Sequence, residues 1–211
     1  MPSYLPSLRL YSKAHRYLRL DPEVSLMLAR KTAEGICRYM FSQTVSSNPG
    51  EIMLEKLIEK FTTDKLVPKR ILTALRTIQQ YGNYGAHDQE DSDSPISEDD
   101  AQPCIMALDS VYYWFLKEYI GVNPKIFTRI DEMNLHPRSE EMLNEAGITY
   151  LGELVVTSEE ELLAITGRHY LLREIRDRLS SAGLSIGMQL DEKTTEELKR
   201  MRVPRDKGSR K

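Results

Sequence analysis

Helical periodicity runs through most of this chain and limits the folds open to it more than any other feature. In "EIMLEKLIEKF" apolar residues stand at positions 52, 54, 57, 58 and 61, which lie on one face of a helix. "PKRILTALRTIQQY" repeats this spacing from Pro68 onward. No segment shows the strict alternation of apolar and polar residues that indicates a strand. The sequence therefore predicts an all-α protein.

Helix start signals mark out the first half of the chain. Asp21 followed by Pro22 is typical of an N-cap with proline at the first helical position. Pro68 opens another helix, and Ser97 with three acidic residues after it is a capped entry to the most apolar helix. Together with the helix around 52–61, these signals predict four helices.

The ends of these helices define the predicted domain. Gly82 is the predicted end of the third helix, because glycine lets the backbone leave the helical conformation. Four helices over about 100 residues predict a four-helix-type bundle at residues 1–120. Residues 121–129, which begin with a Gly/Asn/Pro segment, are a predicted linker.

The second half of the sequence differs from the first in the length of its helical segments. Residues 130–190 read as five short helical pieces separated by glycines. Ser158 with Glu161 three residues later is a capping-box signature. These features predict a second, small helical domain at 130–190. We predict that residues 191–211 are a disordered basic tail.

Cysteine and histidine are too sparse for a metal site or a disulfide framework. The only cysteines, Cys37 and Cys104, are far apart and stand among apolar residues, so we predict buried free thiols in a reducing compartment. The first 20 residues have scattered basic residues and no apolar core, unlike a secretory signal. No membrane span, metal or cofactor is expected, and we predict a cytoplasmic protein.

Charge is strongly segregated along the sequence, although the net charge is only −3. Residues 1–87 carry 13 Lys/Arg and 7 Asp/Glu, whereas residues 88–100 carry seven acids and no base. Residues 131–190 carry 5 Arg and 11 acids, a net charge of −6. Such segregation bears on the choice of partner rather than on the fold.

The segment 130–190 resembles the C-terminal domain of the bacterial RNA polymerase alpha subunit. The resemblance rests on "IDEMNLHPRSEEML", "AGITYLGELVVTSEEELL" and "LREIRDRLSSAGLSIGMQL". It implies a compact fold with two helix-hairpin-helix units that contacts the DNA minor groove and transcription activators. By this resemblance Arg138 is the principal minor-groove arginine and is followed by Ser139. Gly167, Arg168, His169 and Tyr170 lie at the second hairpin.

The sequence departs from that family at the second hairpin and beside Arg138. The family has lysines and a serine after the hairpin glycine, where this protein has "GRHYLL", and the spacing differs by one residue. Glu141 stands where the family has a neutral polar residue. Since DNA affinity comes mostly from neutralised phosphates, a domain of net charge −6 predicts weak DNA binding. Recognition of a protein by the same surface is at least as well supported.

The bundle resembles an uncharacterised helical family, domain of unknown function 4145. The resemblance rests on "DPEVSLMLARKTAEGICRYM" and on a helix that ends Gly-Asn-x-x-Ala-His, here at residues 82–87. Some members of that family are fused to restriction-system proteins. The family is similar to the HEPN superfamily, some of whose members are ribonucleases. The resemblance implies that His87 could act as an acid or base on a ribose hydroxyl while an arginine stabilises phosphate charge.

The sequence near His87 lacks that arginine. Gly82 stands five residues upstream, where the arginine would be, and Arg76 is eleven residues away, about 16 Å along a helix. Only Arg38 or a second protomer could supply the cation. We therefore favour a structural role for His87 and Asn83, and a nuclease would have His87, Asn83 and Arg38 as its site.

These features favour a non-catalytic adaptor or regulator. We expect it to bind a protein of the transcription or restriction and defence machinery, to bind DNA only weakly, and to form homodimers through the bundle. Two alternatives remain open: a HEPN-type ribonuclease or toxin-like defence protein, and a minor-groove DNA-binding regulator.

Overall fold

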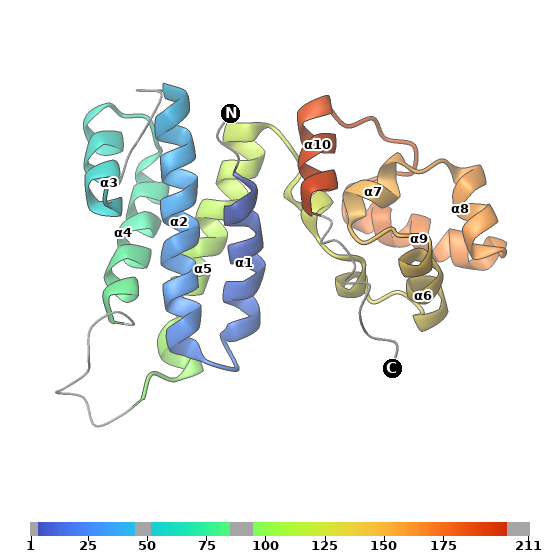
Figure 1. Cartoon of the computed structure of the whole chain (residues 1–211), viewed down its shortest axis with the longest axis horizontal. Helices are drawn as coiled ribbons and strands as arrows, with labels where there is room; N and C mark the ends of the chain where they lie inside the picture. Colours follow the sequence, from blue (N-terminus) through green and yellow to red (C-terminus); the bar gives the residue numbers. More distant parts are fainter. Residues whose placement is uncertain (1–3, 45–51, 85–94, 202–211) are drawn as a thin grey trace. The chain divides into compact units, whose positions relative to one another are not determined.

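The computed structural model describes residues 4–44, 52–84 and 95–201 (Figure 1). The protein divides into two compact units, which meet in sequence at Gly121 and Val122. The described residues are mostly helical and contain no strand, which confirms the all-α prediction. None of the helices described is long and apolar enough to cross a membrane.

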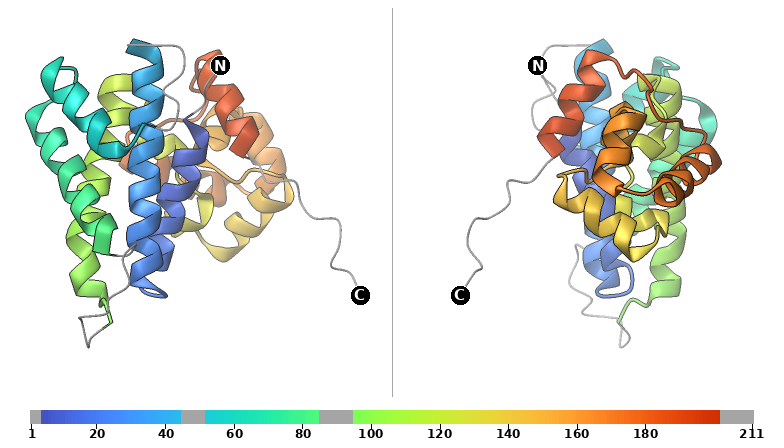
Figure 2. Two further views of the ribbon diagram at one scale, coloured as in Figure 1. Left: turned by 60° about the vertical axis from the view of Figure 1, so that its left-hand side comes forward. Right: turned by 90° about the vertical axis from the view of Figure 1, so that its right-hand side faces the viewer.

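Unit 1 is a helical bundle, and its described residues form five α-helices. These are α1 (Leu5–Tyr17), α2 (Pro22–Thr44), α3 (Leu54–Thr63), α4 (Lys69–Tyr84) and α5 (Glu98–Trp114). The prediction of four helices missed α1, whose scattered basic residues obscure the apolar stripe of Leu8, Ala14 and Leu18. Helix α1 packs mainly along α2, as all views of Figures 1 and 2 show, and α4 packs on α5 and α2.

The predicted helix starts are present. The Asp21 carboxylate accepts a hydrogen bond of 3.1 Å from the backbone N–H of Val24 at the start of α2. At the start of α5, Ser97 Oγ accepts from the backbone N–H of Asp100, and the Asp100 carboxylate accepts from the Ser97 backbone. The Ser97 hydroxyl, which donates to the Asp100 carboxylate at 2.6 Å, and then the Ser97 backbone N–H lower the pKa of Asp100 below its ordinary value. Both caps satisfy backbone donors that a helix leaves unpaired at its first turn.

The prediction that Gly82 ends the third helix is wrong. Helix α4 continues to Tyr84, and Gly82 is buried inside it. A Cβ atom placed at Gly82 would lie 2.8 Å from Cβ and Cδ of Arg30 on α2. The glycine is therefore needed for close approach of a neighbouring side chain, and not for a break in the helix.

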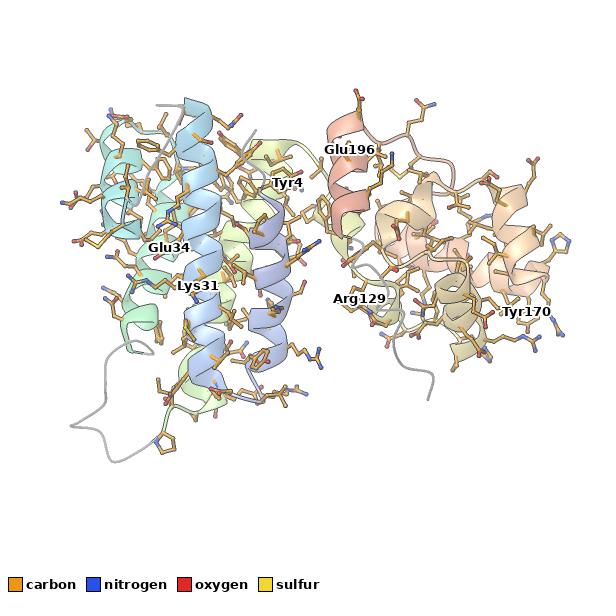
Figure 3. The ribbon with its side chains drawn as sticks, viewed as in Figure 1. Tyr4, Lys31, Glu34, Arg129, Tyr170 and Glu196 are labelled. Carbon is orange, nitrogen blue, oxygen red and sulfur yellow. The ribbon has the colours of Figure 1, made fainter. Side chains whose placement is uncertain are left out.

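An aromatic cluster fills one part of the bundle core. Phe115 is fully buried, and its ring lies 5.6 Å from Tyr4 and 5.8 Å from Tyr39 in edge-to-face contact. Figure 3 shows Tyr4 near the first residues described. Phe115 begins a π-helical extension of α5, Phe115–Ile120, which ends at Gly121 with a φ of 86°. The cluster therefore ties α1, α2 and α5 together.

Both cysteines are free and buried in unit 1, as predicted. Burial raises the pKa of Cys104 to about 12 and also raises the pKa of Cys37. We therefore expect neither thiol to react with a disulfide reagent at pH 8 until unit 1 unfolds, and two thiols per molecule to react in denaturant.

The raised pKa values of the two thiols also predict a pH dependence of stability. Because a raised pKa keeps the proton on the folded form, the free energy of unfolding should fall as pH rises above about 8.5. Ellman titration with and without urea, and urea unfolding between pH 7 and 10, measure these effects. Fast labelling of folded protein would contradict the prediction.

Unit 2 consists of short helical pieces, and the first of them lies within residues 121–129, which the sequence predicted to be a linker. Two 3₁₀ turns, Pro124–Phe127 and Ile130–Met133, are followed by α6 (Pro137–Glu145), α7 (Leu151–Val156), α8 (Glu159–Thr166) and α9 (His169–Ser181). The Ser158–Glu161 capping box opens α8, as predicted. Glycines with positive φ follow three of these helices: Gly147, Gly167 and Gly183.

A last helix corrects the prediction of a disordered tail. Residues Glu192–Met201 form α10, which is capped by Asp191: its carboxylate accepts from the backbone N–H and the hydroxyl of Thr194. Leu198 is buried against α7, where Gly152 leaves room for its side chain. The many charged residues of this segment hid the amphipathic pattern of α10 in the sequence. Residues 202–211 lie outside the described part of the protein.

Candidate functional site

The first turn of α6 is held to α9 by one carboxylate. Glu174 on α9 accepts a hydrogen bond of 2.7 Å from the backbone N–H of His136 and one of 2.8 Å from the Ser139 hydroxyl. His136 in turn caps α6, since its Nδ1 accepts from the backbone N–H of Arg138. Arg178 on α9 also donates to the carbonyl of Asn134. Four contacts thus fix the orientation of the α6 N-terminus.

The two candidate residues of α6 have different surroundings. Arg138 is exposed, and its side chain has no hydrogen bond or ion pair among the described residues. Ser139 is fully buried, and its hydroxyl is engaged by Glu174. Arg138 is therefore free to meet a partner, whereas Ser139 positions the helix that carries it.

The other candidates lie at the turn between α8 and α9. Gly167 ends α8 with a φ of 63°, and Arg168 is extended before α9 begins at His169. Tyr170 is 55% exposed at the periphery of the unit (Figure 3), and the Arg168 guanidinium lies 6.0 Å from its ring centroid. This arrangement is a cation–π contact on an exposed aromatic ring.

Helix geometry places Tyr170 on the same side of α9 as the α6 contact. Tyr170 precedes Glu174 by four residues, so the two side chains share one face of α9. Glu174 in turn bonds to the first turn of α6, so the exposed Arg138 and Tyr170 stand on the two helices that Glu174 joins. We call Arg138, Arg168, His169 and Tyr170 the α6/α9 surface. Glu140 and Glu141 follow Arg138 by two and three residues, so carboxylates stand close to its cations in the sequence.

In unit 1, Arg30 rather than Arg38 contacts the Gly-Asn segment. Arg30 Nη1 donates to the Asn83 side-chain oxygen, and its Nε donates to Glu34 at 3.2 Å. Arg38, two turns further along α2, contacts Glu34 and the carbonyl of Ile52. His87 lies outside the described residues. Sequence reasoning missed Arg30 because only the Arg30–Glu34 spacing of four residues signals it, and that spacing is common on helices.

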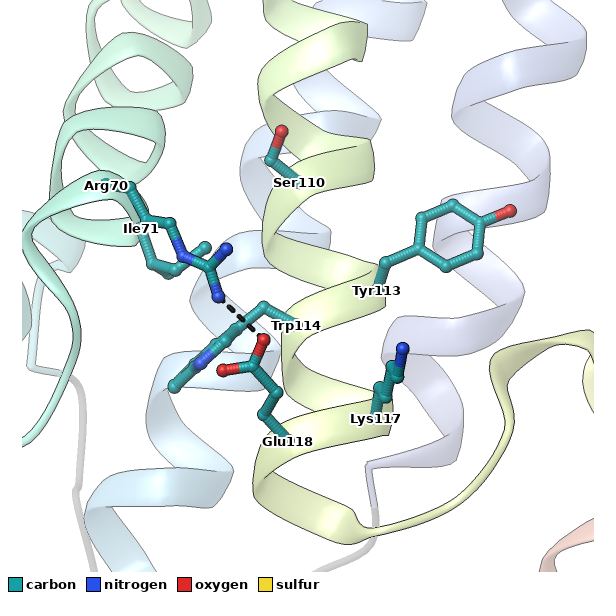
Figure 4. Close-up of a pocket in the computed structure, with 7 residues that line it drawn as sticks. All are labelled: Arg70, Ile71, Ser110, Tyr113, Trp114, Lys117 and Glu118. Carbon is teal, nitrogen blue, oxygen red and sulfur yellow. Dashed lines mark hydrogen bonds and ion pairs between the residues drawn. The ribbon is translucent and has the colours of Figure 1, made fainter.

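Two further clusters in unit 1 were not foreseen. One is a pocket of about 320 Å³ beside Trp114, across which Arg70 and Glu118 form an ion pair of 2.6 Å (Figure 4). The other joins α1 to α5: the Asp109 carboxylate accepts from the Tyr11 hydroxyl at 2.7 Å and lies 2.8 Å from His15 Nε2. Burial and the Asp109 charge raise the pKa of Tyr11, which keeps its hydroxyl a donor.

No cluster of three or more metal-ligating side chains occurs in residues 4–44, 52–84 and 95–201.

Comparison with known proteins gives two family matches, which overlap over residues 118–144. Residues 118–181 match the C-terminal domain of the bacterial RNA polymerase alpha subunit. Over 72 residues the protein is 44% identical to the DNA-directed RNA polymerase subunit alpha of Geobacter metallireducens and 42% identical to that of Pelobacter propionicus. Each match covers 33% of this protein and 21% of the relative, so the protein spans about a fifth of the curated relatives it matches. Residues 12–144 match the domain of unknown function (DUF4145), and since this match covers more than half of the sequence, the protein belongs to the DUF4145 family.

Proposed function

We propose that the protein is a non-catalytic adaptor that docks a protein partner through the α6/α9 surface. The observation that carries the proposal is the exposed Tyr170 with the Arg168 guanidinium over its ring, together with the exposed Arg138 on the helix that Glu174 joins to α9. Exposed tyrosine and arginine side chains dominate the binding energy of protein interfaces. Their backbone is held by the Glu174 contacts, so little order has to be gained on binding.

Charge favours a protein partner over duplex DNA. Residues 131–190 have a net charge of −6, and Glu140 and Glu141 stand two and three residues after Arg138. A DNA-binding surface gains most of its affinity by neutralising phosphates, which these carboxylates oppose. A protein partner with its own cations and an apolar pocket for Tyr170 would complement the same surface. The similarity of this domain to RNA polymerase alpha subunits supports a partner in the transcription machinery.

Site-specific photocrosslinking in cells tests the proposal. A photoreactive phenylalanine in place of Tyr170 should give a dominant protein adduct, which mass spectrometry identifies, and Arg138→Ala should reduce its yield severalfold. The matched control carries the photoreactive residue at the exposed Ser181 on the same helix and should give no such adduct. Equal adducts at both positions, or none at Tyr170, would contradict the adaptor function.

Duplex DNA binding distinguishes the DNA-binding alternative. We expect fluorescence anisotropy with duplex DNA to show only weak, salt-sensitive binding that Arg138→Ala leaves unchanged. Deletion of residues 202–211 should abolish that binding, because these residues are rich in Lys and Arg. A loss of duplex binding on Arg138→Ala with the tail intact would establish a DNA-binding regulator instead.

A further inference from the structure

Arg30 is held in a fixed orientation but uses only part of its hydrogen-bonding capacity. Its side chain is 27% exposed. A guanidinium has five N–H donors, and Arg30 uses one on Nε for Glu34 and one on Nη1 for Asn83. The other three have no acceptor among the described residues. An arginine whose planar group is anchored in this way, with donors to spare, suits a phosphate or carboxylate.

The sequence of α4 is adapted to this arginine. Gly82 leaves the space in which the aliphatic part of Arg30 lies, since any Cβ there would be 2.8 Å from two of its carbons. Asn83, the next residue, accepts the guanidinium bond. Glu34, labelled on α2 in Figure 3, holds the other side of the group. Three residues from two helices thus position one cation.

A polar groove adjoins this arginine and shares Asn83 with it. The groove has a volume of about 280 Å³ and lies between α3 and α4. Its lining is rich in amide and carboxylate groups: Glu55, Ile58, Glu59, Arg76, Gln79, Gln80 and Asn83. Because the oxygen of Asn83 is engaged by Arg30, the amide nitrogen remains as its donor. Amides and carboxylates are the groups that pair with the edges of nucleobases.

We propose that Arg30 and this groove bind a nucleoside phosphate, either free or as one unit of a single-stranded RNA. The phosphate meets the unused donors of Arg30, and the base lies in the groove against Gln79, Gln80 and Asn83. Glu55 accepts from an exocyclic amine of the base. Glu59 already pairs with Lys56 at 2.9 Å. Arg76 has no partner among the described residues and is available to a second phosphate.

The mixed charges of the site exclude simpler ligands. The carboxylates of Glu55 and Glu59 oppose a ligand that is anionic throughout, such as inorganic phosphate. Arg30 and Arg76 oppose a cationic one. A nucleoside phosphate has an anionic end and a neutral, amine-bearing body, so it matches both parts. This site lies in unit 1, and its failure would leave the α6/α9 surface untouched.

Fluorescence polarisation with a labelled single-stranded RNA 12-mer tests the proposal on the full-length protein, with unlabelled AMP, GMP and inorganic phosphate as competitors. Arg30→Gln should weaken RNA binding about tenfold or more, since one charge-assisted contact is lost. Lys31→Gln, at an exposed position of the same helix, is the matched control and should change binding less than about twofold. Gln80→Ala, at an exposed position of the groove, should weaken binding severalfold and leave the thermal unfolding midpoint unchanged, which keeps the test valid if Arg30→Gln unfolds the bundle.

The competitors identify the source of the phosphate. Displacement of the RNA by AMP or GMP, with the same dependence on Arg30 or Gln80, identifies a nucleotide site. RNA binding that depends on these residues without competition by nucleotides identifies a strand site. The proposal is overturned if inorganic phosphate competes as well as the nucleotides, if Lys31→Gln has the effect of Arg30→Gln, if Gln80→Ala has no effect, or if neither RNA nor nucleotide binds.

Discussion

Replacement of Phe115 by alanine is expected to lower the free energy of unfolding of unit 1 by about 3–5 kcal/mol. Phe115 is fully buried and contacts Tyr4, Tyr39 and Tyr119, so truncation leaves a cavity where three segments meet. The aromatic rings around it cannot collapse into this space without breaking their edge-to-face geometry. The loss is comparable to the whole stability of many small domains.

The single tryptophan makes this prediction simple to measure. Trp114 is the only tryptophan of the sequence and lies next to Phe115 in unit 1, so its fluorescence reports unfolding of that unit alone. Urea titration of Phe115→Ala should show a much lower midpoint than the wild type. Met106→Ala, on α5 but 61% exposed, is the control and should change the free energy of unfolding by less than about 0.5 kcal/mol. A similar midpoint for both variants would show that the aromatic cluster does not hold the bundle.

Local signals in the sequence predicted the helix starts and several ends correctly. Asp21, Ser97 and Ser158 each cap the helix that they were expected to open, because a cap involves only residues within one turn. The glycines at 147, 167 and 183 end helices for the same reason. The helical class and the buried cysteines followed from the apolar pattern alone.

The errors share a physical cause, which is contact between residues far apart in the sequence. Gly82 looked like a helix end because a glycine costs helix stability, but Arg30 on α2 requires the space that it leaves. Arg30 was missed as the neighbour of the Gly-Asn segment, because only the packing of α2 on α4 decides which arginine of α2 reaches Asn83. No pattern within α4 carries that information.

Among the candidate binding residues of unit 2, too, some were identified from the sequence and one only from the packing of the helices. Arg138 and Tyr170 were identified from a family resemblance, and both are exposed. Glu174, which joins their two helices, was not identified, because a glutamate on a charged helix resembles any solvent-exposed residue. Its position 35 residues after Ser139 becomes meaningful only when the helices are packed.

Replacement of Glu174 by alanine is therefore expected to destabilise unit 2 by about 2–4 kcal/mol. The change removes the acceptor of the Ser139 hydroxyl, which is buried, and of the His136 backbone N–H. Hydrogen–deuterium exchange with mass spectrometry should show faster exchange in peptides of α6 and α9 and unchanged exchange in unit 1. The Tyr170 photocrosslink should weaken as well, because the first turn of α6, which carries Arg138, is no longer held to α9.

Glu174→Gln separates hydrogen bonding from charge at this position. The glutamine oxygen can still accept from the His136 backbone, and its amide can donate to Ser139 Oγ, so this variant should keep most of the stability and of the crosslink. Asp177→Ala, exposed on the same helix, should resemble the wild type. If Glu174→Gln is as damaging as Glu174→Ala, the negative charge itself organises the surface. If neither has an effect, α6 is held by its apolar contacts alone, and the α6/α9 surface does not depend on Glu174.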